Sequence, residues 1–210
     1  MKVLLLISMT VTLAIAASGQ NVSFKRGATC TNQNVEEISS RGIKVGMTLE
    51  SVLSNFNLSN EKINEARNHA KNPQNFGYLR YNLGNYEGQQ FGERLEGISF
   101  YNFYFLDEKL VGFTVKYKEK PKWKNADQMI EALSKFFPLS PAADWDKNQW
   151  SGSDVYTRHL TCGDYKLIVS AQEDAGTFSV SNQQTDQIVA ERKKKAEDEQ
   201  REKDIKAFKP

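Results

Sequence analysis

The chain has 210 residues, of which 39% are hydrophobic and 26% are charged, and its formal net charge is +2. A charge balance this close to neutral gives no electrostatic support for nucleic-acid binding. The length suits one medium domain or two small ones, with enough residues to bury a hydrophobic core. Only two cysteines occur in the whole chain, which excludes the disulfide-rich scaffold of small secreted toxins.

Residues 1–19 have the features of a secretory signal peptide. Lys2 supplies a positive start, residues 3–16 form an apolar run too short for a stable membrane anchor, and small residues follow. Cleavage after Ala16 or after Gly19 satisfies the small-x-small preference equally well. No second long apolar segment follows. We therefore expect a secreted or periplasmic mature protein without a transmembrane anchor, with an uncleaved N-terminal anchor as the alternative.

The expected oxidising compartment leaves two states open for the cysteines. Cys30 and Cys162 can pair in a disulfide. Alternatively, Cys162 can remain a buried free thiol, because its side chain is expected to point to the same face of the strand as that of Leu160. In the chain-entropy model, a bridge across so long a loop would contribute about 4 to 5 kcal/mol.

Residues 20–120 predict a first unit of helices followed by strands, after a polar lead-in over 20–39. Residues 42–45 ("GIKV") are expected to form a short strand that ends at Gly46. Thr48 is then the expected N-cap of a helix that ends at Phe56, because its hydroxyl can accept a hydrogen bond from an early helical N–H. A second helix is predicted from about Asn60 to Lys71.

Strands with period-two alternation follow these helices. Residues 78–84 predict a half-buried strand, and "GISFYNFYFLDEKLVGFTVKYKE" predicts a hairpin that turns at residues 107–109. The second arm of this hairpin is expected to direct four apolar side chains to one face: Val111, Phe113, Val115 and Tyr117.

Residues 121–182 predict a second unit with the same order of elements. Asn125 is the expected N-cap of a helix whose apolar positions run to Phe137, and three strands are expected at 155–162, 165–171 and 177–182. At an offset of 81 residues, Glu50, Phe56, Leu58 and Ser59 match Glu131, Phe137, Leu139 and Ser140. The shared element order predicts an internal repeat.

Residues 183–210 predict a separate charged tail. Nearly every residue from Glu191 to Lys206 is charged, and several Glu residues precede a cation by four positions, as in Glu202 and Lys206. We expect a solvated helix there, with a partner-binding tail as the alternative.

No motif in the sequence indicates catalysis, a cofactor or a metal. "GIKVGMT" has three residues between its glycines and Met47 where a phosphate-binding loop needs lysine. The two histidines, His69 and His159, have no ligand-spaced partners. "DWDKNQWSGSDV" begins like a calcium loop, but Gln149 replaces its glycine and Val155 its closing glutamate.

Aromatic residues give the best indication of a functional surface. The side chains of Tyr101 and Tyr104 are expected to point to opposite faces of one predicted strand. Trp145 and Trp150 flank a polar loop. Exposed tyrosine and tryptophan side chains are the types that anchor protein interfaces. We therefore predict a protein-binding surface at Tyr101, Tyr104, Trp145 and Trp150; the alternative is that another segment of the chain covers the second face of the sheet.

A resemblance to a known superfamily rests on these elements. A strand entering "GMT", a helix ending at Phe56, a second helix and the hairpin "FLDEKLVGFTVKY" resemble the units of the SmpA/OmlA (BamE-like) family and of the β-lactamase inhibitor proteins. The resemblance covers residues 42–182, and tandem units, as in the inhibitors, would account for the restart near Asn125. It implies binding modules: one branch is a lipoprotein of outer-membrane barrel assembly, and another clamps an enzyme with a concave aromatic sheet.

The sequence departs from both branches. No lipobox cysteine follows the expected cleavage site, and Cys30 and Cys162 cannot form a disulfide within each unit. We therefore predict an α+β protein of two similar units that binds another extracytoplasmic protein without catalysis. A small hydrolase or ligand-binding domain on the same sheets is the alternative, and a structural envelope protein tethered by the charged tail is a third.

Overall fold

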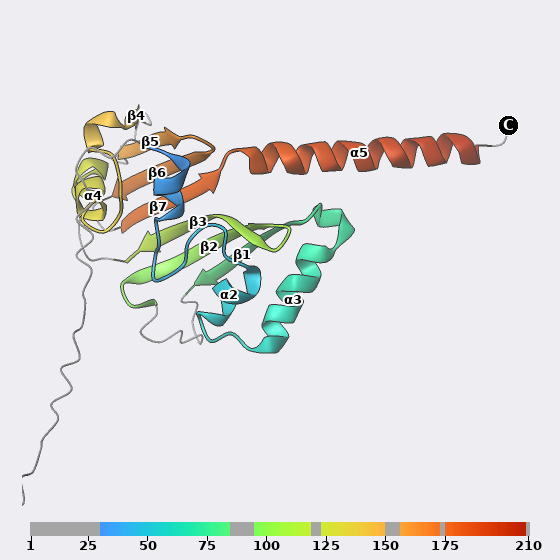
Figure 1. Cartoon of the computed structure of the whole chain (residues 1–210), viewed down its shortest axis with the longest axis horizontal. Coiled ribbons are helices and arrows are strands. Elements are labelled where there is room, and N and C mark those ends of the chain that lie inside the picture. The colour runs from blue at the N-terminus through green and yellow to red at the C-terminus, as the bar shows by residue number, and fades with distance from the viewer. Residues whose placement is uncertain (1–29, 85–94, 119–122, 150–155, 173–174, 209–210) are drawn as a thin grey trace, which may run out of the picture.

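The computed structural model describes residues 30–84, 95–118, 123–149, 156–172 and 175–208. Seven strands form one antiparallel sheet in this part of the chain, and helices are packed against it (Figure 1). The predicted α+β class is therefore confirmed. The expected signal peptide and Trp150 lie outside the described residues.

Helices and strands alternate in two groups along the chain. The α-helices are α1 (Asn32–Glu36), α2 (Leu49–Ser54), α3 (Asn60–Lys71), α4 (Ala126–Leu133) and α5 (Gln184–Ala207), and 3-10 turns occur at Pro73–Asn75 and Ala142–Asp144. The strands are β1 (Tyr78–Gly84), β2 (Ile98–Leu106), β3 (Lys109–Tyr117), β4 (Asp146–Gln149), β5 (Tyr156–Cys162), β6 (Tyr165–Gln172) and β7 (Ala175–Asn182).

The strand order of the sheet is β1-β2-β3-β7-β6-β5-β4. Strands β1 to β3 form one antiparallel meander and β4 to β7 form another, and each meander follows helices in the chain. The two meanders meet through their last strands, because β3 pairs with β7 from Gly112 opposite Ser181 to Tyr117 opposite Gly176. Helices before strands in each group are as predicted, but α1 and β4 were not predicted. The origin of the two groups by duplication stays a prediction.

The predicted helix caps form. The Thr48 hydroxyl accepts the Ser51 backbone N–H at 3.2 Å, and the Asn125 side-chain oxygen accepts the Gln128 N–H at 3.0 Å. Such bonds satisfy donors that the first turn of a helix leaves without intrahelical partners. Both helices are shorter than predicted, since α2 ends at Ser54 and α4 ends at Leu133.

The predicted strand at residues 42–45 is wrong. That segment forms an isolated bridge between Ser40 and Ile43 and then turns at Gly46, where φ is +86°. The Gly46 N–H donates to the Leu110 carbonyl at 2.7 Å, so the segment is held by the start of β3. Glycine suits this turn because a side chain would strain the left-handed backbone.

One face of the sheet, called the inner face here, packs against α1 to α4 in a single hydrophobic core. Aromatic side chains of β2 contribute much of it: the ring of Phe56, which follows α2, lies 5.5 Å from Tyr101 and 5.6 Å from Phe103. The Tyr101 hydroxyl is hydrogen bonded to the Ser40 hydroxyl at 2.7 Å. Burial is the main cause that raises the pKa of the neighbouring Tyr117 to about 12.

A β-bulge changes the predicted facing of the hairpin. The register between β2 and β3 shifts so that Tyr104 is opposite Gly112 while Phe105 is opposite Leu110. The extra residue, Val111, therefore leaves the core, and Leu110 takes its place with 1% of its surface exposed. The turn itself lies where predicted.

The end of the helix predicted from Asn125 to Phe137 also differs. Phe136 lies beyond α4 and is 72% exposed, whereas Phe137 stacks on the core residue Phe178 with ring centroids 5.8 Å apart. Helical spacing predicted both rings on the core side, but only Phe137 reaches the core once the helix has ended.

Cys30 and Cys162 form a disulfide, with their Cα atoms 5.0 Å apart. This decides between the two predicted states of Cys162, since no cysteine among the described residues is free. Beside the bridge, the Asn32 side chain donates to the Asp164 carboxylate and accepts the Asp164 backbone N–H, at 2.9 and 2.8 Å. The start of α1 is therefore fixed to the β5–β6 turn.

The predicted charged helix is present as α5, which extends away from the sheet (Figure 1). Its 24 residues make it about 36 Å long at 1.5 Å per residue. Arg192 holds its first turns in place: the guanidinium donates to both Asp107 carboxylate oxygens at 2.8 and 2.7 Å and to the Phe76 carbonyl at 2.9 Å. These bonds lower the pKa of Asp107.

Candidate binding surface

The face of the sheet opposite the core is the candidate functional surface. We call it the outer face, and define it by side chains that alternate with those of the core: Tyr78, Arg80 and Asn82 of β1; Phe100, Asn102 and Tyr104 of β2; Val111, Thr114 and Lys116 of β3; Thr177, Ser179 and Ser181 of β7; Lys166, Ile168 and Ser170 of β6; and Thr157, His159 and Thr161 of β5. The apolar side chains of α1 to α4 all enter the core on the inner face.

The predicted surface residues are divided between the two faces. Tyr104 lies on the outer face and is partly exposed, as the prediction requires. Tyr101 is fully buried in the core, where its ring stacks on Phe103 at 5.2 Å. Because side chains alternate along a strand, placing Tyr101 against the helices puts Tyr104 on the opposite face. The prediction of an exposed Tyr101 is wrong.

Trp145 is also a core residue. It is 3% exposed, and its indole N–H donates to the Ser140 carbonyl at 3.1 Å. The bond satisfies the one polar group that burial of the ring would otherwise leave without a partner. Trp145 therefore cannot anchor a protein interface. The remaining predicted residue, Trp150, lies outside the described ranges.

Aromatic rings and cations are neighbours on the outer face. The Arg80 guanidinium lies over the Tyr104 ring at 5.9 Å, and the Lys116 ammonium lies over the Phe100 ring at 6.0 Å. In both pairs the ring and the cation belong to adjacent strands. Such contacts hold a charged group and an aromatic ring together in a fixed arrangement at the surface.

Hydroxyl groups occupy the middle of the outer face. Thr114 and Ser179 are hydrogen bonded at 2.9 Å across β3 and β7, and Thr157 and Ser170 at 2.9 Å across β5 and β6. The Tyr104 hydroxyl lies 3.4 Å from that of Thr114. A hydroxyl can donate one bond and accept two, so these pairs retain capacity for a ligand.

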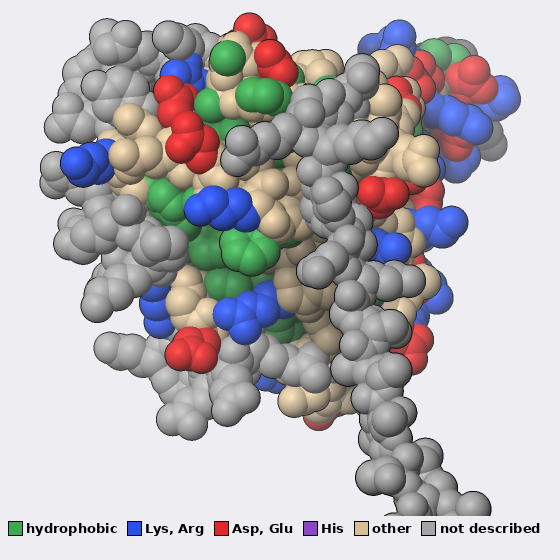
Figure 2. Space-filling view, turned by 60° about the vertical axis from the view of Figure 1, so that its left-hand side comes forward, with side chains coloured by type: hydrophobic (Ala, Val, Ile, Leu, Met, Phe, Trp, Pro, Cys, Tyr) green, Lys and Arg blue, Asp and Glu red, His purple; other side chains and the backbone are tan. Residues whose placement is uncertain are grey.

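The charge of the outer face is unbalanced. Among the residues defining it, the charged side chains are the cations Arg80, Lys116 and Lys166, and none of the three forms an ion pair in the described part of the structure. The side of the molecule at α4 differs, since there acidic and basic side chains are mixed around exposed hydrophobic ones (Figure 2). Two carboxylates lie at the margins of this face, Asp146 opposite His159 and Asp186 at the start of α5, so its positive charge is concentrated at Arg80, Lys116 and Lys166.

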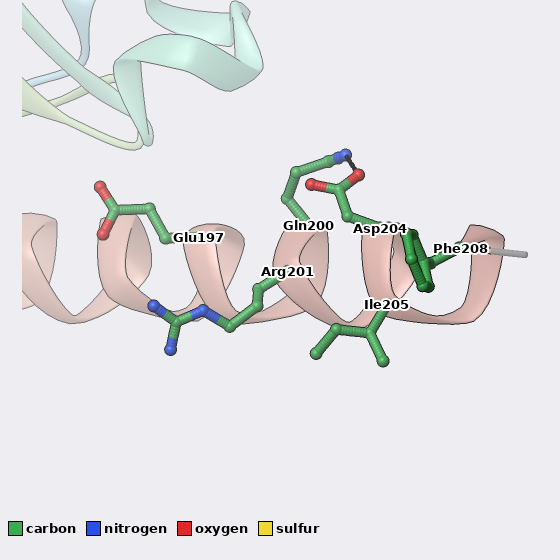
Figure 3. A pocket seen from close by; sticks show the side chains of 6 residues that line it. All are labelled: Glu197, Gln200, Arg201, Asp204, Ile205 and Phe208. Atoms are coloured by element: carbon green, nitrogen blue, oxygen red, sulfur yellow. Dashed lines mark hydrogen bonds between the residues drawn. The ribbon is translucent and has the colours of Figure 1, made fainter. Parts of the chain in front are cut away.

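A hollow on α5 does not form a binding site. It is lined along one helix by residues between Glu197 and Phe208, with Ile205 67% and Phe208 75% exposed (Figure 3). The one hydrogen bond drawn there joins Gln200 to Asp204 at 2.8 Å, four residues apart on the same helix. A hollow with no second element as a wall cannot enclose a ligand.

The two histidines, for which the sequence showed no ligand-spaced partners, have separate neighbours in the structure. His69 contacts Asn75, and His159 lies 3.5 Å from Asp146, its cross-strand neighbour on β4. Among the described residues, no group of three or more His, Cys, Asp or Glu side chains could hold a metal ion. No helix in this part of the chain is both long enough and apolar enough to cross a membrane.

These observations define the class of protein: an α+β protein with helices on one face of a seven-stranded sheet and a positive, aromatic and hydroxyl-bearing surface on the other. Comparisons with protein-family models, curated proteins and solved structures find no match to this chain. The resemblance to the SmpA/OmlA family and the β-lactamase inhibitor proteins therefore stays a prediction.

Sequence reasoning overlooked the cations of this surface. The alternation of residues along β1 and β3 places Arg80 and Lys116 on the same face as the other outward side chains of these strands. This alternation can be read from the sequence. The sequence does not show that β3 pairs with β7, so it could not bring Lys116 and Lys166 onto one face.

Proposed function

We propose that this protein is an extracytoplasmic, non-enzymatic binding module that docks another protein on its outer face. The observation that carries the proposal is a set of three cations that form no ion pair with any described residue, two of them placed over aromatic rings. Aromatic and arginine side chains dominate the binding energy of many protein interfaces. Unpaired cations favour a partner with an acidic surface, because opposite charges accelerate encounter and orient the complex.

Export is part of the same proposal. The Cys30–Cys162 disulfide is compatible with an oxidising compartment, and the sequence of residues 1–19 supports cleavage of a signal peptide. N-terminal sequencing of the exported protein tests this: a start at Ala17 or Gln20 is expected, and an uncleaved N-terminus would contradict it.

We also propose that the two groups of helices and strands arose by duplication. The supporting observation is that each group places helices before an antiparallel meander, and that the meanders join through their last strands. A repeat of this kind would give one continuous docking surface from two small units.

The docking proposal is tested with the mature protein as bait in an extracytoplasmic extract. Captured partners should be lost with Arg80→Ala and with Tyr104→Ala, each by about tenfold or more if the residue is an anchor of the interface. Lys62→Ala is the matched control, because Lys62 is an exposed cation on α3.

Salt dependence provides a second measurement. The association rate of a captured partner should fall as ionic strength rises, because salt screens exposed charges over about 8 to 10 Å at 0.10 to 0.15 M. Capture that is unchanged in both outer-face variants would contradict the proposal, whatever the salt dependence.

A further inference from the structure

A groove crosses the outer face at the end nearest α5. Its volume is about 510 Å³, within the range of about 300 to 1,000 Å³ that is usual for small-molecule sites. It is lined from five neighbouring strands, β1, β2, β3, β7 and β6, and by the start of α5. With strands about 4.8 Å apart, four spacings make the groove about 19 Å long.

The floor of the groove is Gly112, at the centre of the sheet. Tyr104 and Ser181 are its cross-strand neighbours on either side, and all three line the groove. A Cβ atom at position 112 would lie 2.5 Å from the Val180 carbonyl oxygen, a distance that real Cβ contacts do not show. The close approach of the β7 backbone therefore requires glycine here, and as a consequence no side chain rises from the floor of the groove at this position.

Two tyrosines form one end of the groove. Tyr78 and Tyr104 lie close together: burial, then the neighbouring Tyr104, then Asp186 raise the pKa of Tyr78. The start of α5 supplies Asp186 at this end. Phenol rings offer a flat apolar surface with a polar hydroxyl at the rim.

The middle of the groove is polar but neutral. The hydroxyls of Thr114, Ser179 and Ser181 line it, together with the side chain of Asn182. Lys166 is the cation of the groove, and it lies on β6, four strand spacings from Tyr78 on β1. The ligand best suited to this lining is one that makes many neutral hydrogen bonds and presents an apolar surface to an aromatic ring.

Other ligand classes fit less well. An extended peptide bound by strand addition needs the edge of a sheet, whereas this groove runs across the strands on the face. A hydrocarbon ligand would desolvate the hydroxyls of Thr114 and Ser179 without replacing their bonds to water. A polyanion would meet Asp186 at one end and a single cation, Lys166, at the other.

We infer that the groove binds a short, neutral oligosaccharide. Tyr104 and Tyr78 stack on the C–H face of a sugar ring, the hydroxyls of Thr114, Ser179 and Ser181 bond to sugar hydroxyls, and the flat floor at Gly112 admits the chain. The groove shares Tyr104 with the proposed protein-docking surface, whereas Arg80, Lys116 and Phe100 belong to the docking surface and do not line the groove. Saccharide binding without protein capture, or protein capture without saccharide binding, would therefore separate the two proposals.

Isothermal titration calorimetry with the full mature chain tests the inference, using N-acetylchitotetraose, cellotetraose and maltotetraose as probes. At least one should bind with a Kd at or below about 1 mM. Tyr104→Ala should weaken that binding about tenfold through the lost ring, and Thr114→Val, which keeps the volume and removes the hydroxyl, several-fold.

Phe100→Ala is the matched control. Phe100 is an aromatic residue on the same strand and the same face as Tyr104, but it does not line the groove. Its removal should leave saccharide binding within about twofold, since it touches no part of the site. Circular dichroism and thermal melting confirm that each variant is folded.

Three results would overturn the inference. The first is a folded wild-type protein that binds none of the three tetrasaccharides with a Kd below about 10 mM. The second is saccharide binding that neither Tyr104→Ala nor Thr114→Val changes. The third is tetraglutamate binding that Tyr104→Ala abolishes while no tetrasaccharide binds, which would assign the groove to an acidic peptide.

Discussion

Reduction of the Cys30–Cys162 disulfide should remove a large part of the stability of this fold. The two cysteines are 132 positions apart, and the bridge joins a residue two positions before the start of α1 to the last residue of β5. Val35 and Ile38, which follow the bridge, are buried in the core, so the native contacts around it can remain after reduction. The main effect should then be on the unfolded chain, which gains freedom when the bridge is removed.

The expected magnitude follows from the loop that the bridge closes. In the chain-entropy model, 132 residues correspond to about 17 cal/mol/K, or about 5 kcal/mol at 25 °C. Domains of this size are stable by about 5 to 15 kcal/mol in total. The reduced protein is therefore expected to lie near the limit of stability at 37 °C.

Urea unfolding of oxidised and reduced protein measures this difference without a change of sequence. Oxidised protein should unfold at a clearly higher urea concentration, and its m-value should be smaller because the bridged unfolded chain exposes less surface. The double variant Cys30→Ala, Cys162→Ala controls for the reductant, which should not affect it. A difference below about 1 kcal/mol would refute the reasoning, since the bridge would then not constrain the unfolded chain.

Three further predictions concern single contacts. Asp127→Ala should lower the free energy of unfolding in urea by about 2 kcal/mol. The reason is that Arg158, only 12% exposed, loses a carboxylate to which it donates hydrogen bonds at 2.6 and 2.7 Å. Asp127→Asn should lower the free energy of unfolding by less. Burial in the folded state raises the pKa of Tyr117 from 10.0 to about 12. The folded protein therefore holds the phenol proton of Tyr117 more tightly than the unfolded chain does. The stabilisation from Tyr117 is therefore complete below pH 10 and falls between pH 10 and 12 by about 1.4 kcal/mol per pH unit. Burial raises the pKa of Tyr101 as well, so Tyr117→Phe should make the loss of stability with pH shallower, without abolishing it, in urea unfolding at pH 9 to 11.5. Arg192→Ala should speed hydrogen exchange in the first turns of α5 by freeing them from Asp107, while global stability changes by less than about 1 kcal/mol; unchanged exchange would show that these bonds do not hold the helix.

Local signals in the sequence predicted most of the longer elements, but not α1 or β4. The hydroxyl of Thr48 and the amide of Asn125 each bond within three residues, so the start of a helix can be recognised from nearby positions alone. The turns at 107–109 and 163–164 are similarly local, since each joins two runs of alternating residues.

Long-range pairing could not be predicted in the same way. The β3–β7 ladder brings Val115 next to Phe178, 63 positions further along the chain, and no local pattern encodes that register. The bulge at Val111 is equally hidden, because strict alternation places it in the core in place of Leu110.

The candidate surface was predicted only in part for a related reason. Alternation showed that Tyr101 and Tyr104 point to opposite faces, but the side taken by the helices decides which of them is buried. Trp145 was assigned to the surface from its polar neighbours, whereas the Ser140 carbonyl satisfies its N–H inside the core. Burial at such positions depends on contacts made by the folded chain.

The junction of the two meanders has a consequence for assembly. Among the described strands, only the β3–β7 ladder pairs the first meander with the second. If this ladder opens, the first meander exposes β3 and the second exposes β7. The exposed β3 can then pair with β7 of another chain through the same contacts. The Cys30–Cys162 bridge links the two halves covalently and so raises the effective concentration of the partner within the same chain. An oxidised chain therefore closes on itself, whereas in a reduced chain the protein concentration decides between closure and strand exchange.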